Sequence, residues 1–333
     1  MAVTDDMTNQ AHSDVVKLLD YLDSQVVGQH SVVKGILLGL LSSGHVLLEG
    51  LPGTAKTRSV KALANALSIS FGRIQFTPDL LPSDVTGTEV LQESDGKSSL
   101  HFQPGPVFNQ IVLADEINRA PAKVQAALLE AMAEGTITVA GETHSLPELF
   151  MVLATQNPIE QEGTYPLPEA QMDRFLLKVC VDYPTHSAER DIIRLVRQEE
   201  TGEWFSSGIE RVSIDPACIT QARKEITKIE LSELVETYIV NLVMATREPE
   251  QYPESKLSNW LAIGASPRAS IALDKCSRAL AWLEGRDHVI VDDVRAVAPM
   301  VMGHRLSLSY EALADGVSQQ DLVMELLDVV NIG

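Results

Sequence analysis

The sequence predicts an α/β protein in which helices cover both faces of a parallel sheet, followed by a second, helical domain. Short, mostly apolar runs recur at 46–49, 111–114 and 150–154, with helical stretches between them. Strands that are apolar on both faces are typical of parallel sheets buried between helices. From residue 185 onward, only helical patterns follow.

The length of the chain fits two domains. With 333 residues and 45% hydrophobic residues, it exceeds what one compact core usually holds. We place the boundary near residue 201, so that 1–200 form the sheet domain and 201–333 the helical domain.

Composition and charge exclude several classes of protein. No segment approaches the ~18 to 20 consecutive apolar residues of a membrane helix, and the start of the chain, with Asp5 and Asp6, is unlike a secretory signal. We therefore expect a cytoplasmic protein without membrane insertion. The net charge of −20 opposes sequence-independent nucleic-acid binding, although a local basic channel could escape this average. We expect no nucleic-acid partner.

The first elements are two amphipathic helices, one from Ser13 and one at 33–41, because apolar residues recur there at helical spacing. The turn at 26–29 lies between them, at a distance from the following glycine-rich loop where a nucleotide base could pack on Val27 beside Gly28. After that loop, the pattern predicts a helix and then a short strand at 74–76.

Two hairpins interrupt the alternation of strands and helices. The first, at 86–102, has an Asp-Gly turn at its tip, and the second, at 136–146, turns at Ala-Gly. A strand at 175–181 closes the sheet. In the second domain, Pro267 stands at the first position of a helix, and a Ser-x-x-Asp capping box precedes the last helix, at 322–330.

A glycine-rich turn connects the strand at 46–49 to the next helix, and it resembles a phosphate-binding loop. It departs from the pattern G-x-x-x-x-G-K-[ST] only at Ala55. Gly50 and Gly53 permit a tight turn, Lys56 would reach the β and γ phosphates, and the Thr57 hydroxyl would bind Mg²⁺. The alternative is an ordinary strand-to-helix turn. The candidate nucleotide-binding loop comprises Gly50, Pro52, Gly53, Thr54, Ala55, Lys56 and Thr57.

Polar residues follow two other predicted strands, where ligands bind in open parallel sheets. Asp115 could hold Mg²⁺ together with Thr57, and the adjacent Glu116 could take a proton from the attacking water. Asn157, after the strand at 150–154, could hold that water by a hydrogen bond. As alternatives, Asp115 would cap a helix and Asn157 would be a turn residue.

Two arginines complete the candidate set. Arg174 lies between two apolar stretches, and its alternative is a surface ion pair with Asp173. Arg268 lies in the first turn of a helix, where a cation opposes the helix dipole, so an anionic phosphate is a plausible partner.

These motifs resemble those of AAA+ ATPases, and specifically those of the MoxR family, over nearly the whole chain. The alanine in the loop is part of the resemblance. The matching stretches are Gly50-Leu51-Pro52-Gly53-Thr54-Ala55-Lys56-Thr57, Thr77-Pro78-Asp79-Leu80-Leu81-Pro82-Ser83-Asp84, Leu113-Ala114-Asp115-Glu116-Ile117-Asn118-Arg119-Ala120-Pro121, Leu167-Pro168-Glu169-Ala170-Gln171-Met172-Asp173-Arg174-Phe175 and Gly264-Ala265-Ser266-Pro267-Arg268-Ala269.

The resemblance implies a P-loop αβα core with a helical lid, use of ATP and Mg²⁺, and a ring, usually hexameric, with nucleotide between protomers. The first hairpin would be the helix-2 insert and the second the presensor-1 hairpin. The resemblance implies Walker roles for Lys56, Asp115 and Glu116, sensor 1 for Asn157, an arginine finger supplied to the neighbour for Arg174, and sensor 2 for Arg268.

Three functions are compatible with this reasoning. The resemblance favours a chaperone-like ATPase that remodels or activates a partner protein, commonly one with a von Willebrand A domain. A nucleic-acid motor of the same clade would need basic hairpins, but 136–146 contains no Lys or Arg, and Lys97 is flanked by Glu93 and Asp95. The third is a nucleotide-gated scaffold whose hydrolysis is incidental.

Overall fold

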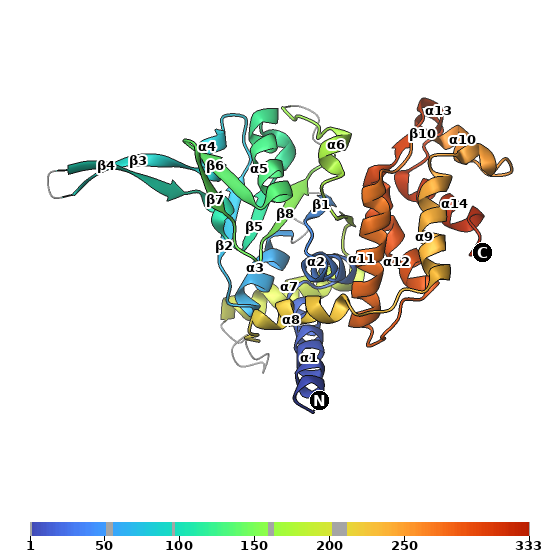
Figure 1. Cartoon of the computed structure of the whole chain (residues 1–333), viewed down its shortest axis with the longest axis horizontal. Helices are drawn as coiled ribbons and strands as arrows, with labels where there is room; N and C mark the ends of the chain where they lie inside the picture. The colour runs from blue at the N-terminus through green and yellow to red at the C-terminus, as the bar shows by residue number, and fades with distance from the viewer. Residues whose placement is uncertain (1, 51–55, 95–96, 159–162, 202–211, 333) are drawn as a thin grey trace.

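A computed structural model describes residues 2–50, 56–94, 97–158, 163–201 and 212–332. Figure 1 shows a sheet domain with a hairpin projecting from one side and a mainly helical domain on the other side. None of the described helices combines the length and the apolar character needed to cross a bilayer.

The central sheet is parallel throughout and confirms the predicted fold class. Its five strands lie in the order β2 (Phe71–Gln75), β5 (Ile111–Asp115), β8 (Met151–Gln156), β1 (Val46–Gly50) and β9 (Leu177–Val181). Side chains alternate between the two faces, so Val46 and Leu48 enter one core whereas Leu47 enters the other. Both faces are therefore buried, which explains the apolar runs in the sequence.

Helices form a layer on each face of the sheet. One layer contains α1 (Ala2–Gln25), α2 (His30–Leu41), α3 (Lys56–Ala66) and α8 (Ala217–Ile226), and the other is built on α4 (Pro82–Thr86) and α5 (Ala122–Glu134). Helix α2 is apolar nearly all round, and nine of its twelve residues are buried. It therefore lies inside the molecule and not on its surface. Helix α7 (His186–Thr201) follows β9.

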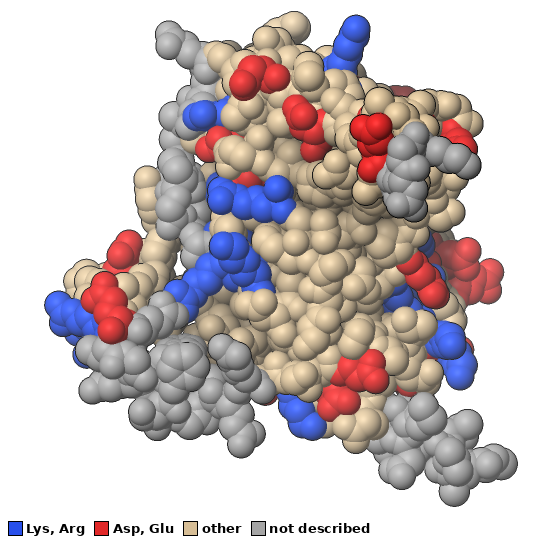
Figure 2. All heavy atoms as spheres, turned by 90° about the vertical axis from the view of Figure 1, so that its left-hand side faces the viewer, with Lys and Arg blue, Asp and Glu red and all other residues tan. Residues whose placement is uncertain are grey.

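Both predicted hairpins are present. The longer one pairs β3 (Gly87–Ser94) with β4 (Lys97–Pro104), and the shorter one pairs β6 (Thr136–Val139) with β7 (Glu142–Ser145). Phe102 stacks on His144 with 4.0 Å between the ring centroids, which joins the bases of the hairpins. Figure 2 shows the side of the molecule from which the longer hairpin projects, with both signs of charge around a broad uncharged area.

The second domain is mostly helical, as predicted. Its helices are α9 (Glu233–Ala245), α10 (Leu257–Trp260), α11 (Pro267–Leu283), α12 (Val291–Met302), α13 (Tyr310–Ala314) and α14 (Gln319–Val329). The expectation of helices alone is wrong in one detail, because β10 (Leu261–Ile263) pairs with β11 (Ser307–Leu308). The runs that form them are too short to stand out in the sequence. The predicted cap of α14 is confirmed, because the Ser318 side chain accepts a hydrogen bond from the Asp321 N–H.

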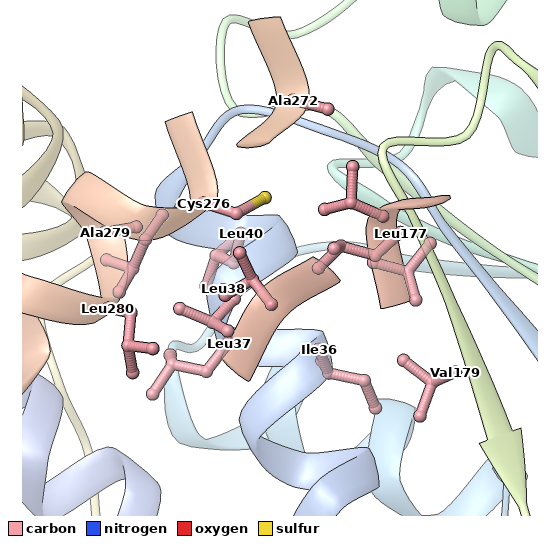
Figure 3. Close-up of a cluster of buried hydrophobic side chains, with 14 of the residues drawn as sticks. Ile36, Leu37, Leu38, Leu40, Leu177, Val179, Ala272, Cys276, Ala279 and Leu280 are labelled. Atoms are coloured by element: carbon pink, nitrogen blue, oxygen red, sulfur yellow. The ribbon is translucent and has the colours of Figure 1, made fainter. Parts of the chain in front are cut away.

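The two domains share a continuous apolar junction. Figure 3 shows side chains of α2, β9 and α11 meeting in it. The labelled residues are Ile36, Leu37, Leu38, Leu40, Leu177, Val179, Ala272, Cys276, Ala279 and Leu280. Burying one large apolar side chain contributes roughly 1.5–3 kcal/mol, so this contact fixes α11 on the sheet domain. The boundary near residue 201 stays a prediction: α8 follows it in sequence, yet Arg223 of α8 donates to the Leu40 carbonyl oxygen at 2.7 Å.

Candidate active site

Several of the residues predicted to act on nucleotide, Lys56, Thr57, Asp115 and Asn157, lie at the carboxyl edge of the sheet. Lys56 and Thr57 begin α3, close after the end of β1 in the sequence, and Asp115 is the last residue of β5. Asn157 follows β8 and is buried. Since these strands are parallel neighbours, their ends meet at one edge. The predicted binding residues Pro52, Gly53, Thr54 and Ala55 lie outside the described residues.

Gly50, the last residue of β1, packs tightly against the edge strand β9. A Cβ atom at this position would lie 2.4 Å from the Val181 carbonyl oxygen. Close approach of the neighbouring strand thus requires glycine here, a reason that the sequence pattern alone did not show. The Lys56 ammonium donates a hydrogen bond to the Gly50 carbonyl oxygen at 2.5 Å, so the lysine bridges the two ends of the loop.

The Asp115 carboxylate is held by two residues that the sequence did not single out. The Thr155 hydroxyl donates to Asp115 Oδ1 at 2.6 Å and accepts from the Glu116 N–H at 2.8 Å. On the other side, Arg73 Nη2 donates to Asp115 Oδ2 at 2.6 Å. Asp115 therefore lies within β5 with its side chain bound across the sheet, and the alternative of a helix cap is not supported.

Glu116 has a strained backbone at the junction of strand and helix. Its φ of 57° and ψ of 50° place it in the left-handed region, which costs a residue with a Cβ roughly 1–2 kcal/mol. Its side chain accepts from Gln75 Nε2 at 2.8 Å and pairs with Arg119 at 3.2 Å. The side chain is thereby held on the same edge as Asp115.

The turn at Val27 and Gly28 also lies at this edge. Gln29 Nε2 donates to the carbonyl oxygen of Asp182, the residue after β9, at 2.8 Å. Gly28 has φ of +77°, and a Cβ there would lie 2.5 Å from the Cβ of Ala188. The positive φ and this close approach explain the glycine, and Val27 is half-buried beside it.

The two predicted arginines lie together at the opposite, amino edge of the sheet. Arg174 precedes β9 and donates to the Leu129 carbonyl oxygen at 2.6 Å. Arg268, in the first turn of α11, lies 3.5 Å from Asp173. With about 3.3 Å per strand residue, the length of β1 alone separates the two edges by about 13 Å. The structure therefore brings the arginines close to each other but not to the carboxylates.

The two arginines line one hollow of about 210 Å³. Its cationic side chains are Arg174, Arg268, Lys275 and Arg305, and its carboxylate is Asp173. The alternative of a simple Asp173–Arg174 ion pair is not what the contacts show, because Asp173 pairs with Arg305 at 2.9 Å and with Arg268. Four cations against one carboxylate make this hollow basic in a chain of net charge −20.

Comparisons with known proteins agree with this architecture. A family model described as "ATPase family associated with various cellular activities (AAA)" matches residues 45–177, and one for the AAA lid domain matches residues 257–326. Chaperone MoxR1 of Mycobacterium tuberculosis is 45% identical over 314 residues, which span 92% of this chain and 78% of the relative. The chain belongs to the MoxR family of AAA+ ATPases.

Two other proteins also match over most of this chain and of their own length. Protein MoxR of Paracoccus denitrificans is 34% identical and aligns with 86% of this chain and 87% of its own. A crystal structure of a protein from Cytophaga hutchinsonii superposes with a TM-score of 0.89 at 40% identity, covering 99% of this chain and 98% of the other. Membership of the MoxR family implies ATPase activity in general, with use of nucleotide and Mg²⁺.

The side chains of this MoxR-family protein suit a magnesium nucleotide. Mg²⁺ prefers hard oxygen ligands, and the carboxyl edge offers the Asp115 carboxylate and the Thr57 hydroxyl. Lys56 adds a cation for the phosphates. Arg73, Gln75 and Thr155 are polar residues of this edge that the sequence reasoning missed. Arg73 and Gln75 alternate with apolar residues in β2, and that alternation is the signal that could have placed them at a strand end.

Proposed function

We propose that this MoxR-family protein binds and hydrolyses ATP at sites that adjacent protomers share in a ring, which we expect to be hexameric. The cycle would remodel or activate a partner protein, and we expect a partner with a von Willebrand A domain. The name of the relative, Chaperone MoxR1, supports the chaperone-like part of the proposal.

One observation carries the shared site. The carboxylates and Lys56 are at the carboxyl edge, whereas Arg174 and Arg268 are at the amino edge, about 13 Å away along β1. No hydrogen bond spans that distance, so the arginines of one subunit are unsuited to the phosphates that the same subunit binds. A neighbour that turns its amino edge toward this carboxyl edge would complete the site.

Each residue then has a distinct task. Lys56 binds the β and γ phosphates, and Thr57 and Asp115 hold Mg²⁺, which when bound neutralises charge on the phosphate oxygens. Glu116 orients the attacking water and takes its proton, while Asn157 holds the same water by a hydrogen bond. The turn at Val27 and Gly28 packs against the base.

The basic hollow supports the contribution of the neighbour. A concentrated positive charge in an acidic protein attracts anions, and developing charge on a γ-phosphate is the anion that this proposal needs to stabilise. Arg174 and Arg268 would act on it directly. Lys275 lies in the same hollow and would add to the local potential.

Complementation between two inactive variants tests the shared site. Arg174→Ala keeps its own Walker residues but offers no arginine finger, whereas Lys56→Ala offers the arginine but cannot use its own loop. Each variant should be inactive alone, and the hydrolysis rate of Arg174→Ala should be lower than that of wild type by a factor of about 10³ to 10⁵. A mixture of the two should regain ATPase activity as the protein concentration rises, because recovery requires assembly. Arg194→Ala, which removes an exposed arginine of α7, is the control and should behave as wild type.

Failure of the mixture to regain activity, while labelled subunits demonstrably assemble together, would contradict the shared site. The same assay separates the other functions. Stimulation of ATPase activity by DNA at near-physiological salt would favour a nucleic-acid motor. Turnover that no protein partner changes would favour a nucleotide-gated scaffold.

A further inference from the structure

Asp173 connects the sheet domain to three groups of the helical domain. It lies between α6 (Glu169–Met172) and β9, directly before Arg174. Its Oδ1 accepts from Arg305 Nε at 2.9 Å, and its Oδ2 accepts from the Ser266 hydroxyl at 2.8 Å and from Arg268 Nη1 at 3.5 Å. One carboxylate therefore contacts the start of α11, where Ser266 and Arg268 lie, and also Arg305, which follows α12.

Arg305 gives this carboxylate a fixed partner. Its side chain is only 2% exposed, and its guanidinium also donates to the carbonyl oxygens of Phe175 at 2.7 Å and Leu176 at 3.1 Å. A buried guanidinium is tolerated only where its donors are satisfied, so the Asp173–Arg305 pair is held in one geometry. Asp173 is accordingly a rigid acceptor at the base of the basic hollow.

Arg268 depends more on this acceptor. Its side chain is 56% exposed, and its guanidinium contacts Asp173 at 3.5 Å. The backbone beneath it is fixed, because the Ser266 hydroxyl caps α11 at the Arg268 N–H and α11 packs on α2 and β9 (Figure 3). Orientation of the guanidinium is thus the remaining freedom, and an arginine side chain carries about 2 kcal/mol of rotamer entropy.

We propose that Asp173 is a positioning residue that holds the Arg268 guanidinium beside Arg174, so that both point at one anion. The anion would be the γ-phosphate of nucleotide bound by the adjacent protomer, and the inference therefore rests on the proposed shared site. The guanidiniums of Arg174 and Arg268 line the same hollow and repel each other, and the negative charge of Asp173, which lines that hollow too, offsets this repulsion. The two guanidiniums are then oriented before nucleotide binds, and groups that are already in place lower the activation barrier of hydrolysis.

Asp173→Asn is a selective probe of this role. The asparagine Oδ1 can still accept from Arg305, and its Nδ2 can donate to the Ser266 hydroxyl, but it cannot accept from Arg268. We expect turnover to fall about 10-fold to 100-fold, the loss that misplacement of a reacting group by about 1 Å produces, with KM for ATP within about twofold. The matched control is Asp274→Asn, which breaks a pair with Arg278 inside α11 and should leave turnover unchanged.

Two further readouts distinguish positioning from a general structural role. In an Arg268→Ala background, Asp173→Asn should cause no additional loss, because it acts through Arg268. Mixed with Lys56→Ala, Asp173→Asn should regain activity, because its own Walker residues are intact. Its thermal unfolding midpoint should fall below that of Asp274→Asn, because the buried Arg305 guanidinium loses its carboxylate, so turnover is compared at a temperature well below both midpoints.

Several outcomes would overturn the inference. Wild-type turnover in Asp173→Asn, or additive loss with Arg268→Ala, would each show that the carboxylate does not position Arg268. If Arg174→Ala regains activity on mixing with Lys56→Ala but Asp173→Asn does not, the shared site stands and the role of Asp173 fails. If neither regains activity, the shared site itself fails, and this inference with it.

Discussion

Substituting Glu116 by glutamine should separate nucleotide binding from hydrolysis. The left-handed backbone at φ 57° is equally strained for either side chain, because both carry a Cβ. The glutamine Oε1 can still accept from Gln75 Nε2. What the substitution removes is a carboxylate that can take a proton.

The two energies involved differ enough to be told apart. The lost ion pair with Arg119 joins side chains that are 28% and 41% exposed, and pairs with such exposure contribute about 0–1 kcal/mol. Loss of a general base lowers turnover about 10² to 10⁴-fold, or about 3–5 kcal/mol in the barrier. Glu116→Gln should therefore fold and bind ATP almost normally while hydrolysing it hundreds of times more slowly or worse.

Steady-state phosphate release, titration with a fluorescent ATP analogue and urea unfolding measure these three quantities on the same preparation. Glu130→Gln, an exposed carboxylate of α5, is the matched control and should equal wild type in all of them. If Glu116→Gln retained wild-type turnover, Glu116 would not be the base. If it lost ATP binding as well, the side chain would serve the nucleotide pocket rather than the water.

Two further predictions concern the metal site and pH. Thr155→Val removes the hydroxyl that donates to Asp115 and accepts from the Glu116 N–H. The Mg²⁺ concentration for half-maximal activity should rise several-fold, and the free energy of unfolding should fall by about 1–3 kcal/mol. An unchanged Mg²⁺ titration would refute this role of Thr155. Burial lowers the pKa of His45 to about 4, below its value of 6.5 in an unfolded chain. As the pH drops, the unfolded state therefore binds the proton first. The free energy of unfolding should fall between about pH 6.5 and pH 4, by up to about 3 kcal/mol. Urea midpoints at pH 7 and pH 5 should differ less in His45→Asn than in wild type, and equal differences would contradict the assignment.

The sequence predicted the central sheet well because burial on both faces leaves a strong apolar signal. The strands around Leu47, Leu113 and Leu153 were placed within one or two residues of their observed bounds. The edge strand β2 was predicted too short, because Arg73 and Gln75 interrupt its apolar residues. Those two polar side chains hold Asp115 and Glu116, so the same residues that serve the site obscured the strand.

The carboxyl edge of the candidate site was also predictable, since local motifs and the parallel topology together bring Lys56, Asp115 and Asn157 to it. The arrangement at the amino edge was not. Arg174 and Arg268 are far apart in the sequence, and their proximity depends on how α11 packs against α2 and β9. Packing of one domain on another has no local signature, because it depends on the shapes of both surfaces at once.

The contacts around Arg268 also limit how the helical domain can move relative to the sheet domain. Asp173 lies shortly before β9, Arg305 donates to carbonyl oxygens of the same segment, and Val179 of β9 belongs to the same buried cluster as residues of α11. A rotation of the helical domain would have to break the buried Asp173–Arg305 pair, which would leave a charge without its partner at a cost of about 3–5 kcal/mol. The first turn of α11 should therefore move with the amino edge of its own sheet, so that Arg268 and Arg174 approach or leave a neighbouring nucleotide as one unit.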